Sequence, residues 1–262
     1  MSVKGALTLL AHSGLIHALY VVRQLVLILF LFSVVDVAAA QPMRMLIPKK
    51  AVAGGAGITK IDNVTVADVT PSTSDTWSVT NNATTNDFIL VAAGAFIGGG
   101  GGTITGATYN GVAMTVIGET GTDSGNRFAL FGLSAPASGA NNLVVSYSAS
   151  ASEAAAVVST WENVHQTTTS AFSGFNSATG TSTTPAVTIT SASGGVVVDG
   201  LYFFGVTATA HASQTTLGNA QQASSAVSMG SSYEAGATSV SMDWTLGGSI
   251  NWGIAGCSIK QP

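Results

Sequence analysis

The chain has 262 residues, and only 8% of them are Asp, Glu, Lys or Arg, against about a quarter in typical soluble domains. Residues 61–259 contain eleven acidic side chains and one basic one, Arg127, which gives a net charge of −10. Nucleic-acid binding depends on Lys and Arg that neutralise phosphates, so this composition excludes it for the body of the chain. The single cysteine, Cys257, excludes an intrachain disulfide and Cys-rich metal or redox motifs. We expect it to be a small buried hydrophobe.

An apolar segment near the start of the chain, residues 24–40, follows a basic residue and ends in three alanines. This order is typical of a secretory signal peptide, and it predicts cleavage after Ala40 and a secreted or surface-displayed protein. Two alternatives stay open for residues 1–40. The segment is an uncleaved membrane anchor, although it is short for a span and contains an acidic residue, or translation starts at Met43 or Met45 and no export signal exists.

Residues 41–60 mix Pro, Lys, Gly and small side chains without a period, which indicates a flexible arm or linker. The arm contains four bases: Arg44, Lys49, Lys50 and Lys60. A basic arm therefore precedes an acidic body. From residue 61 the β-branched residues predominate, and about 200 residues are enough to bury a core without metals or disulfides. We predict one β-sandwich domain over residues 61–262.

The body contains about a dozen short segments rich in β-branched and aromatic residues, each bounded by Gly, Ser, Asn or Pro, as in sandwiches and barrels. The predicted strands are 61–70, 76–80, 87–96, 103–110, 112–118, 127–133, 141–149, 154–162, 185–191, 195–206, 227–235, 238–246 and 250–260. No segment after residue 41 keeps a helical period, so helices should be minor. The predicted fold class is all-β, an antiparallel, jelly-roll-like β-sandwich after an N-terminal hydrophobic segment.

Two local features concern turns. Asn110-Gly111 separates two predicted strands, and a two-residue type I′ turn needs positive φ at both positions, which Asn and Gly adopt readily. The pair predicts a tight β-hairpin. The run Gly98–Gly102 also lies between strands, and we expect a mobile loop tip there because such a run loses much entropy when it is fixed.

Four segments resemble a recurrent all-β domain of phage virion-associated proteins and of large secreted or surface proteins of bacteria. They are DFILVAAGAF (87–96), ATYNGVAMT (107–115), VSTWENVHQTTT (158–169) and WTLGGSINWGIAGCSIK (244–260). The resemblance implies a jelly-roll or concanavalin-like sandwich and carries over no catalytic residue. That group has a Gly-Val-Asp-Gln-Thr-Thr-Pro-like turn after a strand. Here Asn163, His165 and Thr169 stand in place of its Gly, Asp and Pro, which leaves the geometry of this turn open.

The sequence offers few ligands for a metal. His165 and His211 are the only histidines of the body, and a zinc site needs three or four converging ligands. We expect Glu162 and His165 to be an accidental surface pair. Asp123, in a polar loop, is a weak candidate for calcium. No catalytic, cofactor-binding or metal-binding residue is predicted.

Carboxylates and tryptophans were the remaining candidates for chemistry. A glycosidase needs two carboxylates facing each other across a cleft, and five acidic residues are candidates for that role: Glu153, Glu162, Asp199, Glu234 and Asp243. Solvated strand faces explain them without a site. Exposed tryptophans stack on sugars, but we expect Trp161, Trp244 and Trp252 to belong to the core.

Three functions are compatible with this sequence. The favoured hypothesis is a non-enzymatic structural or adhesion module displayed on a virion or cell surface. It associates with itself or with other virion or surface proteins through the arm, or through residues 61–70 added to a neighbouring sheet edge. The alternative is a secreted carbohydrate-binding domain with a glycan ligand, and the third is a sandwich hydrolase. Membrane contact is expected only through residues 24–40, if they are retained.

Overall fold

A computed structural model describes residues 57–98, 101–122, 125–221 and 227–262. The chain divides into two compact units at residues 51 and 52, and everything below concerns the second. The predicted signal peptide, most of the predicted arm and the calcium candidate Asp123 lie outside the described residues. Within the described residues, no helix is long and apolar enough to cross a membrane.

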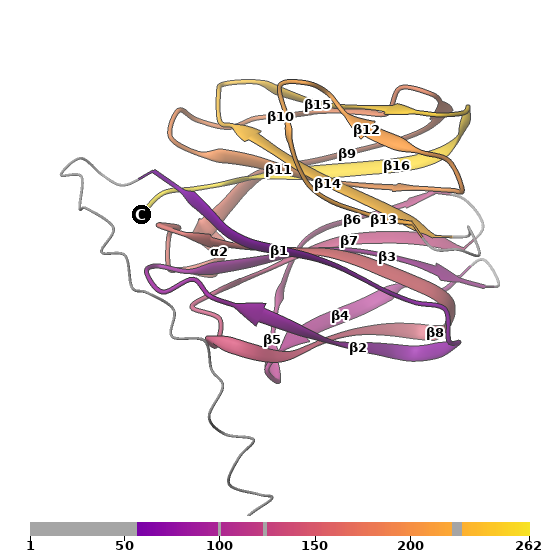
Figure 1. Ribbon diagram of the computed structural model, residues 1–262, viewed down its shortest axis with the longest axis horizontal. Helices are drawn as coiled ribbons and strands as arrows, with labels where there is room; N and C mark the ends of the chain where they lie inside the picture. The colour runs from indigo at the N-terminus through magenta and orange to yellow at the C-terminus, as the bar shows by residue number, and fades with distance from the viewer. Residues whose placement is uncertain (1–56, 99–100, 123–124, 222–226) are drawn as a thin grey trace, which may run out of the picture. The chain divides into compact units, whose positions relative to one another are not determined.

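The described part of the chain forms strands almost throughout (Figure 1). The strands are β1 (Thr59–Asp68), β2 (Ser72–Asn81), β3 (Phe88–Ile97), β4 (Ile104–Tyr109), β5 (Val112–Ala113), β6 (Thr115–Thr122), β7 (Asn126–Ser134), β8 (Gly139–Glu162), β9 (Phe172–Ser182), β10 (Ala186–Ile189), β11 (Val196–Phe203), β12 (Ala208–Ala210), β13 (Thr215–Gln221), β14 (Ser228–Ala235), β15 (Val240–Leu246) and β16 (Ile250–Ile259). One short helix, α2, spans Thr168–Ala171.

The 24-residue strand β8 organises the largest sheet. Its first half pairs with β2 and β4, and its second half pairs with β1 and β3, all antiparallel. Asp68 lies opposite Ala154 and Ser72 opposite Ala151, so β1 and β2 in succession follow β8 from end to end. The pairing of β2, β3 and β4 with β8 is irregular where the two halves meet. Such irregularities bend strands, and here the ribbon folds over itself (Figure 1).

Folding produces four stacked layers with three apolar cores between them (Figure 1). The outer half-sheet contains β2, the first half of β8, β4 and β5, and the inner half-sheet contains β1, the second half of β8, β3, β7 and β6. The middle sheet has the order β13-β14-β11-β16-β9, and the top sheet has the order β10-β15-β12. The strands are paired antiparallel throughout, which confirms the predicted all-β antiparallel sandwich class.

The position of a strand in the stack of layers explains whether its sequence is apolar throughout or alternates between apolar and polar residues. The central strands of the inner half-sheet and middle sheet are covered on both faces, and β3 (FILVAAGAFI) is accordingly buried at every position except Phe96. Strands with one wet face alternate instead, as β10 and β15 do. The mainly apolar strands β3 and β11, of which β11 contains the buried Asp199, therefore belong to layers that are covered on both faces.

Most predicted strands are confirmed, with three kinds of error. Segments 141–149 and 154–162 are one strand, because β8 continues from Gly139 to Glu162 although its pairing is irregular at the bend. Segment 112–118 divides into β5 and the start of β6. Strands β9, β12 and β13 were missed, since β9 is rich in Ser and Gly and β12 has only three residues.

The predicted hairpin at Asn110-Gly111 is confirmed, because both residues have positive φ, 50° and 76°. The predicted mobile loop tip at Gly98–Gly102 lies partly outside the described residues, which omit 99 and 100. A Cβ on Gly102 would lie 2.0 Å from Ile97 Cγ2, so this position admits only glycine without rearrangement. Gly98 and Gly101 have open space beside them and carry no such requirement.

The turn after β8 shows how the departures from the resembled motif are accommodated. Asn163 has a φ of 61°, a left-handed conformation that Gly favours and Asn tolerates. The backbone N–H of Thr167 donates to His165 Nδ1 at 3.1 Å, as it would to an aspartate side chain two residues earlier in an Asx turn. His165 is therefore part of the local turn.

Candidate interaction site

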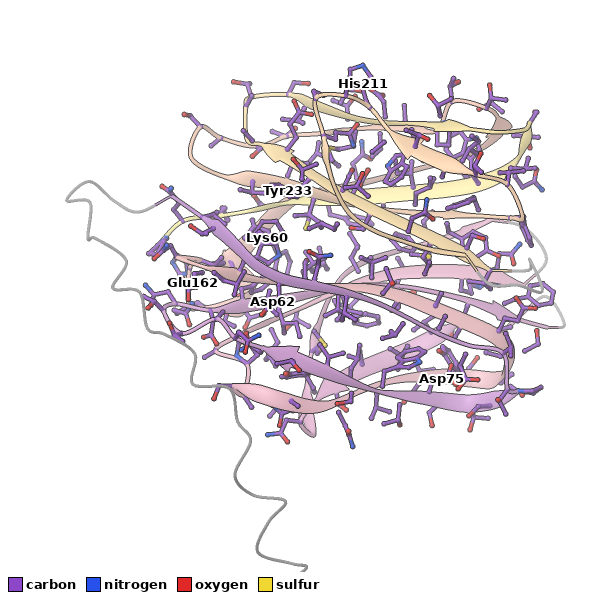
Figure 2. The ribbon with its side chains drawn as sticks, in the orientation of Figure 1. Lys60, Asp62, Asp75, Glu162, His211 and Tyr233 are labelled. Atoms are coloured by element: carbon purple, nitrogen blue, oxygen red, sulfur yellow. The ribbon has the colours of Figure 1, made fainter. Side chains whose placement is uncertain are left out.

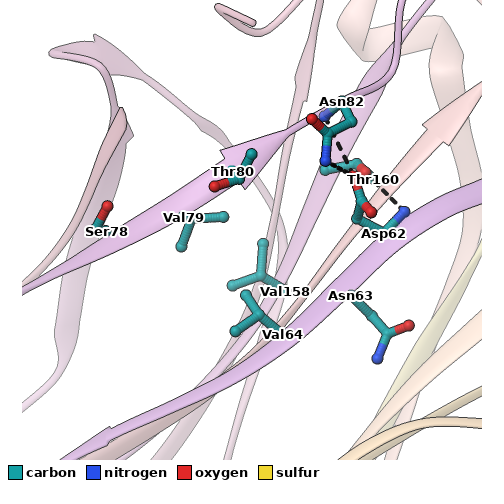
Figure 3. Close-up of a pocket in the computed structure, with 9 residues that line it drawn as sticks. All are labelled: Asp62, Asn63, Val64, Ser78, Val79, Thr80, Asn82, Val158 and Thr160. Carbon is teal, nitrogen blue, oxygen red and sulfur yellow. Dashed lines mark hydrogen bonds between the residues drawn. The ribbon is translucent and has the colours of Figure 1, made fainter. Parts of the chain in front are cut away.

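Strands β1 and β2 border an opening in the folded sheet. Within the described residues each of them pairs with β8 alone, so each has one free edge. Between them lies a groove of about 200 Å³ (Figure 3). It is lined by Asp62, Asn63 and Val64 of β1, Ser78, Val79 and Thr80 of β2, Asn82, and Val158 and Thr160 of β8. Val64, at 36% exposure, is among the few large apolar side chains left in solvent.

At one end of this groove, two carboxylates accept hydrogen bonds from the loop that follows β2. Asn82 donates to Asp62 Oδ2 from its side-chain nitrogen at 2.8 Å and from its backbone at 3.3 Å. Glu162 Oε1 accepts from the backbone and the hydroxyl of Thr84, at 2.8 and 3.1 Å. Asp62 and Glu162 lie at the same end of the folded sheet as Lys60 (Figure 2). These carboxylates fix the loop after β2, which is a structural role.

The free edge of β1 carries features that discourage pairing with another chain. Its register shifts between Lys60 and Asp62, and both of these residues are charged. Lys60 Nζ donates to Asn63 Oδ1 at 2.7 Å, and Asn63 in turn donates to the carbonyl of Leu217 on β13. Bulges and charges are the usual means by which natural proteins protect sheet edges. We conclude that β1 is protected.

The free edge of β2 exposes no charged side chain, and its one register shift, between Ser72 and Ser74, lies at the start of the strand. From Ser74 to Asn81 its pairing with β8 is regular. The side chains it exposes along the outer face are all hydroxyls: Ser74, Thr76, Ser78 and Thr80. Its one acidic residue, Asp75, is buried at 5% exposure. Thus β2 offers an uncharged edge, in which the backbone N–H and carbonyl of Ser74 are bonded to the hydroxyl of Ser72 and the residues after Ser74 continue the row.

The remaining edges among the described strands are short, irregular or covered. Strands β5, β10 and β12 have two, four and three residues. The pairing of β6 and of β13 is interrupted by register shifts. Strand β9 lies against β10, where Asn176 donates to the Thr188 carbonyl at 3.0 Å. Of the edges that the structure describes, β2 is the one best suited to accept a strand.

The most deeply buried carboxyl group belongs to Asp199, on β11 of the middle sheet, with no exposed surface. Trp244 of the top sheet donates its indole N–H to Asp199 Oδ2 at 2.6 Å, and Ser232 of β14 donates its backbone N–H and its hydroxyl to Oδ1 at 2.7 and 2.8 Å. Gln214 extends the network by donating to Ser232 Oγ at 2.7 Å. Burial raises the pKa of Asp199 to about 7, against the opposing effect of its donors. This network joins two sheets.

The other acidic candidates also accept hydrogen bonds within the fold. Glu153 accepts from the backbone of Val227 at 3.0 Å, and Asp243 accepts from Ser241 at 2.9 Å. Glu234 accepts the Ser213 hydroxyl at 3.1 Å, which directs that proton away from His211. In the described part of the chain no three His, Cys, Asp or Glu residues lie close enough to hold a metal ion.

The predicted core positions of three tryptophans and of the cysteine are confirmed. Trp161, Trp244 and Trp252 are 0%, 2% and 8% exposed, and Cys257 is fully buried. Burial raises the pKa of the Cys257 thiol to about 12, so it stays protonated and unreactive. Trp77 alone among the tryptophans is half-buried. An exposed stacking surface made of two tryptophans is therefore not formed.

Comparison with known proteins adds no family to this description. No protein-family model, no curated protein and no solved structure matches the chain.

Proposed function

We propose that this chain is a non-enzymatic structural or adhesion module displayed on a virion or cell surface, where it assembles through its sandwich edges and its basic arm. The observation that carries the proposal is the free, uncharged edge of β2 beside the groove that it shares with β1. Natural sandwiches protect such an edge unless another strand covers it. An edge left open is a site for strand addition.

Charge supports the same proposal. Residues 61–259 have a net charge of −10, whereas the bases Arg44, Lys49 and Lys50 precede the strands. Opposite charges on arm and body favour contacts between copies and steer their encounter. The outer hydroxyl row of β2 supplies a surface that bears no like charges. Contacts between copies of this kind are what an assembling surface module requires.

Location and assembly are tested together. Antibodies against the folded body should label intact virions or cells of the source, and protease added outside should remove that label. Labelling that appears only after lysis contradicts the proposal. In solution, the full chain should form assemblies that dissociate as salt rises, because arm and body attract each other electrostatically.

The contribution of the arm is measured with a deletion of residues 41–56, which leaves β1 intact because β1 begins at Thr59. We expect smaller assemblies by analytical ultracentrifugation. A matched control replaces Arg44, Lys49 and Lys50 by Gln and keeps the length of the arm. Assemblies that are unchanged in both variants would remove the arm from the proposal and leave the strand edges as the only contacts.

A further inference from the structure

We infer that β2 pairs antiparallel with β2 of a second copy of this chain, around a two-fold axis that passes beside Trp77. This inference rests on the proposed function and names the partner of one edge. The β2 sequence, STSDTWSVTN, is compatible with itself in that arrangement. An isologous contact of this kind uses the same patch on both copies.

The register follows from the sequence of β2. With Trp77 opposite its own copy, Thr76 faces Ser78 and Ser74 faces Thr80, so the outer face consists of hydroxyl pairs. Cross-strand Thr and Ser pairs stabilise sheets by hydrogen bonding. On the inner face Asp75 lies opposite Val79, which avoids two carboxylates in direct opposition. Residues 75–79 overlap fully in this register and allow about five interchain backbone hydrogen bonds at one per residue. Ser74 adds to them when its backbone exchanges Ser72 Oγ for the partner strand.

Trp77 provides an independent argument. Three tryptophans are buried, but Trp77 keeps part of its surface in solvent beside the core of the folded sheet. Directly opposed residues of antiparallel strands have Cβ atoms about 5 Å apart. The two indoles would therefore cover each other's remaining exposed surface. Aromatic cross-strand pairs are among the stabilising ones.

Electrostatics favours this edge over the other surfaces of the body. Two bodies of net charge −10 repel each other, so they associate best where both surfaces are uncharged. The β2 edge meets that condition, whereas β1 presents Lys60 and Asp62. Pairing would extend the outer half-sheet into one sheet with the order β5-β4-β8-β2-β2-β8-β4-β5. Salt screens the repulsion that remains between two bodies, so a chain that lacks residues 41–56 should dimerise more tightly as salt rises.

The test uses two double variants of the full chain at exposed positions. Thr76→Lys with Ser78→Lys places lysines opposite each other twice in this register, and we expect the dimer dissociation constant to rise by about ten-fold or more. Thr76→Lys with Ser78→Glu places opposite charges there, and the dimer should persist. A control, Ala186→Lys with Thr188→Lys on the exposed face of β10, should not change the dissociation constant.

Ultracentrifugation measures the dissociation constant, and acrylamide quenching of Trp77 fluorescence reports whether that indole is covered. A monomeric wild-type chain, or a dimer equally stable in all three variants, overturns the β2 pairing. The proposed function is contradicted by a different result, namely antibody labelling that appears only after lysis. A dimer lost on deletion of residues 41–56 but unaffected by the Lys pair would identify the arm as the occupant of the edge and would also overturn the inference.

Discussion

The two buried aspartates of this molecule differ in what surrounds them. Asp199 lies between the middle and top sheets, is fully buried and accepts three hydrogen bonds from Trp244 and Ser232. Asp75 lies inside the folded sheet near its open edge, at 5% exposure, and accepts one, from Tyr147 at 2.7 Å. A polar network therefore ties the upper layers together, whereas the lower layers depend mainly on apolar burial.

Burial raises the pKa of both carboxyl groups. More hydrogen bonds act to lower the pKa at Asp199 than at Asp75, yet complete burial still raises the pKa of Asp199 to about 7. At Asp75 the hydrogen bond from Tyr147 acts against burial, and nearby Asp68 adds to the increase. Removing each group in turn measures how much the two regions depend on their polar contacts.

The largest effect is expected for Asp199→Ala. The substitution leaves the Trp244 indole N–H and the Ser232 donors buried without an acceptor and creates a cavity, which should lower the free energy of unfolding by about 3–5 kcal/mol. Urea denaturation at pH 5 measures it. The control Asp243→Ala, on a half-buried residue of β15, the strand that carries Trp244, should cost less than about 1 kcal/mol. Equal losses in the two variants would contradict the role of the network.

The pH dependence of stability should follow from the same residue. Because the folded-state pKa of Asp199 is raised to about 7 from 3.8, its contribution is fully favourable below about pH 4 and is lost as pH rises to about 7. The size of that change is on the order of 4 kcal/mol. Asp199→Asn should flatten the profile between these pH values in urea titrations. A wild-type profile that the variant leaves unchanged would show that folding does not shift the pKa of Asp199 and would contradict the prediction.

A smaller effect is expected for Tyr147→Phe in the lower layers. The change removes the hydroxyl that donates to Asp75 and should cost about 1–3 kcal/mol, since one buried acceptor loses its partner. Tyr233→Phe on β14 makes the same chemical change on a half-buried side chain and serves as the control in thermal unfolding. A Tyr147→Phe loss as large as that of Asp199→Ala would erase the distinction between the two regions.

Local chemistry determined several features of this protein from sequence alone. The Asn110-Gly111 turn, the buried strands at 87–96 and 250–260 and the core tryptophans were predictable, because turn geometry and strand burial depend on neighbouring residues. Strand β13 was not predictable, since its stability comes from pairing with β14 rather than from its own sequence.

Tertiary structure alone decided how the strands stack and which edge stays open. The bend in β8 places residues 139–151 and 151–162 in different layers, and nothing in the local pattern of a continuous strand reveals such a fold. The three donors of Asp199 come from residues 33 and 45 positions away, so a solvated position was expected there and a buried one is found. The free edge of β2 is likewise a property of the pairing, because an edge is defined by the strand that is missing beside it.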